Sequence, residues 1–111
     1  MTAGTDSYQA PKTKASKLAR PKICYHWTVA EVQKWFKRHC SEYYALYAHY
    51  FSEHEINGKA LVGLSQSSLL RLGITNAEHR DALCRQILKL RLKADIMEMR
   101  EIQMRHRITS A

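Results

Sequence analysis

Apolar side chains recur every three or four residues along most of the chain after residue 22, the spacing of one buried face of an α-helix. The first stripe lies within residues 29–38. It follows Thr28, and Glu31 stands three residues further on. At this spacing Thr and Glu form a capping box, in which each side chain accepts a hydrogen bond from a free backbone N–H of the first turn. The pattern predicts a helix over residues 29–38.

A second stripe, rich in tyrosine, predicts a helix over residues 42–52 with Ser41 as its cap. Its expected buried face consists of Tyr43, Leu46, Tyr47, Tyr50 and Phe51.

Two short helices are expected next. Asn57 is placed to cap the first, which carries Ala60, Leu61 and Leu64 and has Gly63 in its interior. Ser65 is placed to cap the second, and its apolar residues are Leu69, Leu70 and Leu72.

Gly73 follows this last apolar run, where a helix commonly ends in the left-handed conformation that glycine adopts cheaply. Thr75 and Glu78 then read as another capping box, so a long helix is expected from about residue 76 to at least residue 98. Its stripe comprises Leu83, Ile87, Leu90, Ala94 and Met97, widened by Leu88 and Leu92.

The predicted fold class is all-α, because no alternating β-branched runs compete with the helical spacing. Four short helices and one long one form a domain over residues 23–93. Residues 94–111 are expected to project, since the other helices are too few and too short to cover them. Residues 1–22 are polar and basic, contain two prolines, and are predicted to be a disordered tail.

The net charge of +8 is unevenly distributed. The first 22 residues carry +4, whereas residues 40–70 contain Lys59 against Glu42, Glu53 and Glu55. The domain is therefore expected to have a mildly acidic middle and basic flanks. The three cysteines form no pattern, and with no apolar leader at the N-terminus they indicate reduced thiols in a cytoplasmic protein.

Neither catalysis nor a cofactor is expected from the chain. Its six histidines are scattered and lack the partners of a catalytic triad. Cys24-x-His26 and His39-Cys40 are the best metal ligands by type, but their spacing does not match that of paired zinc ligands. Buried thiols and surface imidazoles are the simpler interpretation.

The order of these features resembles a sterile alpha motif (SAM) domain over residues 25–92. The resemblance is carried by Trp27, the run TVAEVQKWF from Thr28, Tyr50-Phe51, the run INGKALVGL from Ile56, and Leu69-x-x-Leu72-Gly73-Ile74. It implies a five-helix bundle with a long fifth helix. It also implies head-to-tail pairing, in which the start of that helix on one domain docks on the middle of another domain.

The resemblance assigns two surfaces to this chain. The end-helix surface comprises Gly73, Ile74, Thr75, Asn76, His79 and Arg80. The mid-loop surface comprises Glu53, Glu55, Asn57, Lys59, Ala60, Leu64, Ser65 and Gln66.

A chain that is little more than this domain further resembles SAM-only adaptors. That likeness implies a scaffold role in receptor tyrosine kinase–Ras/MAPK signalling, through pairing with the SAM domain of the scaffold connector enhancer of KSR. Such a partner would account for any recruitment to the membrane. Because Lys59 dilutes the acidic mid-loop surface, a different SAM partner met through the end-helix surface is expected.

Two alternatives remain open at this point. The first is self-polymerisation, since head-to-tail contacts that do not close give filaments. The second is binding of an RNA hairpin, with the candidate basic residues Lys34, Lys37, Arg38, Arg80 and Arg85.

Overall fold

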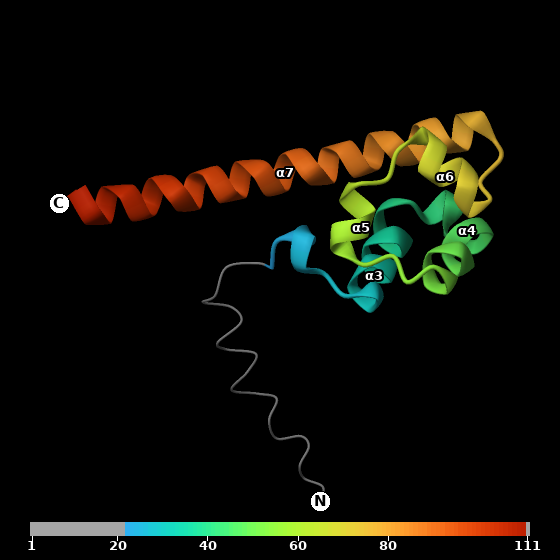
Figure 1. Ribbon diagram of the computed structural model, residues 1–111, viewed down its shortest axis with the longest axis horizontal. Helices are drawn as coiled ribbons and strands as arrows, with labels where there is room; N and C mark the ends of the chain where they lie inside the picture. The colour runs from blue at the N-terminus through green and yellow to red at the C-terminus, as the bar shows by residue number, and fades with distance from the viewer. Residues whose placement is uncertain (1–21, 111) are drawn as a thin grey trace, which may run out of the picture.

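The computed structural model describes residues 22–110, with side chains described up to residue 107, and the predicted tail lies almost wholly outside this range. The described elements are the 3-10 turn η1 (Cys24–His26) and the helices α3 (Val29–His39), α4 (Ser41–Glu53), α5 (Gly58–Val62), α6 (Gln66–Leu72) and α7 (Ala77–Ser110). The predicted all-α class is confirmed (Figure 1).

Three of the predicted helix caps are confirmed. Thr28 Oγ1 accepts from the Glu31 backbone N–H at 3.2 Å, and Glu31 Oε1 accepts from the Thr28 N–H at 2.9 Å. Asn57 caps α5 by accepting from the Ala60 N–H at 3.0 Å. Ser65 caps α6 through the backbone of Ser68.

Two predicted caps are wrong. Ser41 is the first helical residue of α4, because α3 and α4 are joined by Cys40 alone and leave no room for a separate cap. The α7 helix begins at Ala77, so its cap is Asn76, whose Oδ1 accepts from the His79 N–H at 3.1 Å. Thr75 and Glu78 therefore form no capping box. Gly63 was also placed wrongly, since it follows α5 instead of lying inside it.

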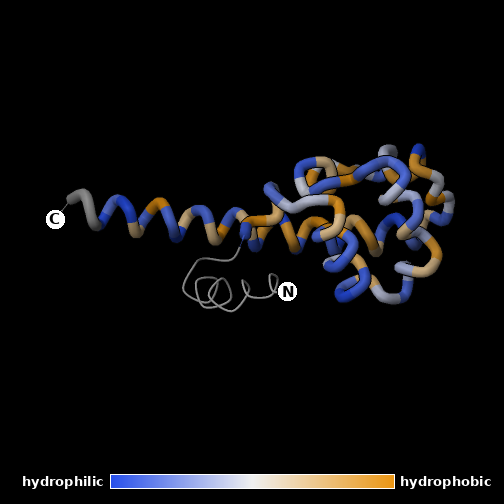
Figure 2. The backbone as a smooth tube through the Cα atoms, turned by 90° about the horizontal axis from the view of Figure 1, so that it is seen from below, coloured by the Kyte–Doolittle hydropathy of each residue, from blue (hydrophilic) through white to orange (hydrophobic). Residues whose placement is uncertain are grey.

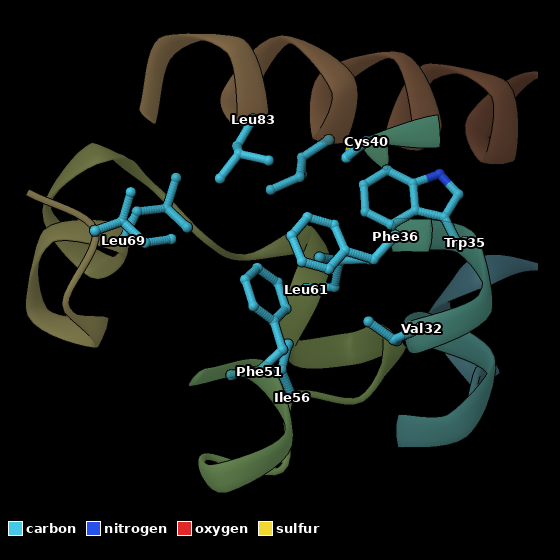
Figure 3. Packing of buried hydrophobic residues seen from close by; sticks show 11 residues of the cluster. Val32, Trp35, Phe36, Cys40, Phe51, Ile56, Leu61, Leu69 and Leu83 are labelled. Atoms are coloured by element: carbon cyan, nitrogen blue, oxygen red, sulfur yellow. The ribbon is translucent and has the colours of Figure 1, made fainter. Parts of the chain in front are cut away.

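The core fills the space that α3, α4, α5, α6 and α7 enclose (Figure 3). At its centre the rings of Phe36 and Phe51 stack at 4.7 Å between centroids. Leu61, Leu69 and Leu83 are each at most 1% exposed. Aromatic pairs at this separation add to the free energy gained from burying their area.

A second, smaller cluster fastens η1 to the middle of α7. It contains Cys24, Val62 and Ala94, all buried. Tyr25 adds a polar contact, because its hydroxyl donates to Asp95 at 3.1 Å. Gly58 of α5 allows η1 to lie close to the α5 backbone, because a Cβ atom at this position would lie 1.8 Å from the Cys24 carbonyl oxygen.

The inner face of α7 follows the predicted stripe, with Leu83, Ile87 and Ala94 buried. Leu88 and Leu92 do not widen that face, since they are 49% and 53% exposed. The helix carries no buried side chain between Ala94 and residue 107. Figures 1 and 2 show this C-terminal part extending well past the other helices. Leu46 of α4 was also expected to be buried and is 51% exposed.

Candidate protein-interaction surfaces

The chain turns a sharp corner between α6 and α7. Gly73 has a φ of 122°, the positive value predicted for a helix stop, and its α-carbon faces the ring of Tyr50. The next residue, Ile74, turns inward, and its N–H donates to the Leu69 carbonyl at 3.1 Å. Its side chain is fully buried. Ile74 therefore contributes no side chain to the end-helix surface to which it was assigned.

Arg80 ties this corner together. Its Nη1 donates to the Ile74 carbonyl at 3.0 Å, and its Nε donates to Gln66 Oε1 at 2.9 Å. The Gln66 amide in turn donates to Asp81. Hydrogen bonds from a charged donor are stronger than neutral ones, so Arg80 is held in a defined position at the start of α7.

Gln66 was expected on the mid-loop surface. The structure places its side chain against Arg80 and Asp81, so it belongs with the start of α7. Sequence reasoning missed this because Gln66 and Arg80 are 14 positions apart and no local pattern connects them.

His79, which was assigned to the end-helix surface, is half-buried. Its Nδ1 lies 2.6 Å from the Tyr47 hydroxyl, and its ring centroid lies 4.9 Å from that of Tyr43. Burial raises the pKa of Tyr43, with the Glu42 charge as a further cause. The two tyrosines of α4 therefore support the first turn of α7, a role that their four-residue spacing alone did not reveal.

The exposed edge that remains at this corner is formed by Thr75, Asn76, Ala77 and Glu78. Half-buried His79 and Arg80 flank it. The first backbone N–H groups of a helix have no intrahelical acceptor, which gives a helix start a partial positive charge. The edge thus presents a hydrogen-bonded backbone, few bulky side chains, the Glu78 carboxylate and the Arg80 cation.

The residues predicted for the mid-loop surface lie along the α4–α5 connection, α5 and the turn into α6 (Figure 1). Glu53, Glu55 and Lys59 are exposed, and Leu64 is half-buried. Asn57 and Ser65 are also exposed, but their side chains are used as helix caps. The charged groups available here sum to −1.

The cysteines show no metal-binding or reactive arrangement. Residues 22–110 contain no group of three or more His, Cys, Asp or Glu side chains placed to hold a metal ion. Cys24 and Cys40 are buried, and burial raises the pKa of the Cys40 thiol to about 12. Nor does any helix in that range combine the length and the apolar character needed to cross a bilayer.

Comparison with known proteins shows which family and which relative this chain is similar to. The SAM domain (sterile alpha motif) family matches residues 26–91. Protein aveugle of Drosophila melanogaster is 44% identical over 101 residues, which cover 90% of this chain and 94% of that protein. The similarity to aveugle extends beyond the domain into both flanks. The helices, their order and both comparisons agree that this chain belongs to the SAM domain family.

Proposed function

We propose that this chain is a non-enzymatic adaptor that binds the SAM domain of another protein through its end-helix surface. The observation that supports this most directly is the hydrogen-bonded corner at the start of α7, in which the Arg80 cation donates to the Ile74 carbonyl at 3.0 Å. A preformed surface loses little conformational entropy on binding.

The chemistry of the corner favours an acidic acceptor surface. Arg80 and the free N–H groups of the first turn of α7 both attract carboxylates. Glu78 and Asp81 stand beside them, so the partner's acidic groups have to be placed opposite Arg80. Charge placement of this kind sets partner choice and association rate more than total affinity.

The chain's own mid-loop surface is a poor match for this corner. Its net charge of −1 combines two glutamates with Lys59, and two of its polar side chains are occupied as helix caps. A heterotypic complex with a more acidic mid-loop is therefore proposed in preference to a polymer of this chain. The RNA alternative is weakened at this corner, because the acidic Glu78 and Asp81 stand beside Arg80.

The partner that we propose is the SAM domain of the scaffold connector enhancer of KSR, in receptor tyrosine kinase–Ras/MAPK signalling. The SAM family membership and the 44% identity to protein aveugle support an adaptor role. Such an adaptor acts in the cytoplasm without a cofactor, and reaches the membrane only through its partner.

Calorimetric titration of the partner SAM domain with two charge variants tests which surface is used. Thr75→Glu places an acidic group on the exposed edge without removing a cap, and we expect it to lower affinity by at least about tenfold. Lys59→Glu is the control on the mid-loop surface and is expected to retain affinity. His79 and Arg80 are less suitable for mutation, because both also hold the fold.

The opposite pattern, loss with Lys59→Glu and retention with Thr75→Glu, would assign binding to the mid-loop surface. Unchanged affinity in both variants would remove both assignments.

A further inference from the structure

A groove of about 1000 Å³ runs between η1 and α3 on one side and the middle of α7 on the other. It shares no residue with the end-helix surface or the mid-loop surface. Its apolar lining comes from the segments around η1, from α3 and from α7, and includes Ile23, Trp27, Trp35, Leu90 and Met97. Both tryptophans of the chain therefore line this groove.

The rim of the groove is cationic. Its basic residues are Lys22, Lys34, Lys37 and Arg38 on one side and Lys89 and Lys93 on α7. Glu31 is the acidic residue among its lining, and it is already engaged by Lys22 at 3.0 Å and by the Thr28 N–H. These contacts, with the Thr28 backbone as the largest cause, lower the pKa of Glu31.

The other basic residues of the rim form no ion pair with a side chain of residues 22–107. Lys22 pairs with Glu31, and Lys37 lies 5.9 Å from the centroid of the Tyr44 ring. Like charges gathered at one groove repel one another and raise the local concentration of anionic ligands.

We propose that this groove binds an acidic segment of a partner protein, anchored by an apolar side chain on the apolar lining of the groove. The apolar floor favours a bound segment with an aliphatic or aromatic side chain, and the cationic rim favours carboxylates on either side of that side chain. The adaptor would then hold a second partner at a site independent of SAM pairing.

Three other occupants fit less well. A nucleic acid would need an exposed aromatic face for base stacking, whereas Trp35 is only 8% exposed. The chain's own N-terminal segment carries the same positive charge, with Lys12, Lys14, Lys17 and Arg20. A second copy would offer its mid-loop surface as an acidic face, and the net charge there is only −1.

Intrinsic tryptophan emission of the full chain reports on this groove directly. The probe is a Trp-free synthetic peptide in which a Leu-Leu pair is flanked by runs of Glu, and we expect a saturable change in emission. The triple variant Lys34→Glu, Lys89→Glu, Lys93→Glu should weaken binding by at least about tenfold. The charge-matched triple variant Arg71→Glu, Arg100→Glu, Arg107→Glu lies outside the groove and should bind within about twofold of wild type.

The groove variant should still pair with the SAM partner, and Thr75→Glu should still bind the peptide. Several results would overturn the proposal: no saturable emission change, equal loss in both triple variants, or equal binding of a peptide with Lys in place of Glu. Tighter, groove-dependent binding of a hairpin RNA or of phosphatidylserine vesicles would also overturn it, and would assign the groove to that ligand instead.

Discussion

At Gly58 the backbone of α5 passes directly beneath the 3-10 turn η1. Its N–H donates to the Trp27 carbonyl at 2.9 Å, and a Cβ atom would lie 1.8 Å from the Cys24 carbonyl oxygen. Because the obstructing atom is backbone, Gly58→Ala has to separate η1 from α5. We expect it to lower the free energy of unfolding by more than about 3 kcal/mol, measured by urea denaturation.

Gly63→Ala is the matched control for this substitution. Gly63 has a φ of −93°, and a Cβ atom there would lie no closer than 3.6 Å to the Ala60 carbonyl oxygen. Its unfolding free energy should change by less than about 1 kcal/mol. Similar losses in the two variants would show that η1 does not pack on α5 in this way.

The buried Cys40 thiol is expected to make the folded protein less stable at alkaline pH. The thiol is 4% exposed, and burial raises its pKa from 9.0 to about 12. Above pH 9 the unfolded chain releases this proton while the folded chain keeps it, so stability falls as pH rises toward 12. The contribution to the slope is up to about 1.4 kcal/mol per pH unit.

Urea denaturation of wild type and Cys40→Ala across this pH range checks the effect. The variant should be less stable at neutral pH but should lose stability less steeply between pH 9 and 12. Parallel curves for the two proteins would mean that Cys40 ionises equally in the folded and unfolded states.

At the scale of single elements, two adjacent residues are candidate caps for α7, and only one of them caps the helix. Asn76 accepts the His79 N–H at 3.1 Å, whereas Thr75 is exposed and makes no cap. Asn76→Ala should therefore cost about 1 kcal/mol of unfolding free energy, and Thr75→Ala less than about 0.5 kcal/mol. Thermal unfolding of the two variants measures the difference. A larger loss of unfolding free energy in Thr75→Ala than in Asn76→Ala would support the capping box predicted at Thr75.

These caps also show what local sequence can and cannot determine. The box at Thr28 was predictable because its partners, Thr28 and Glu31, lie within one helical turn. At the start of α7, the burial of Ile74 fixes the path of the chain, so the helix begins only at Ala77. Glu78 then stands at the second helical position and cannot reach back to Thr75. The outcome depends on packing against the core, which the local pattern does not contain.

For the whole molecule, helical spacing was enough to predict the all-α class and the buried stripe of α7. It did not predict which side chains of the end-helix surface face outward. Ile74 turns into the core, and Arg80 reaches back to Gln66. Both orientations are set by tertiary contacts, which the local sequence pattern does not contain. The basic groove was likewise not foreseen, since its two walls come from segments at least 47 positions apart in the sequence, residues 22–39 and 86–97.

The proposed adaptor thus has two candidate binding sites that share no residue, one at the start of α7 and one along its middle. Its proposed function depends on the first forming a discrete complex. The most direct test is sedimentation velocity of the full chain, alone and mixed with the SAM domain of connector enhancer of KSR.

The chain alone should sediment as a monomer at all concentrations, and the mixture should give a single 1:1 complex. Growth of the chain alone into large species, or failure of the mixture to form a complex, would contradict the account.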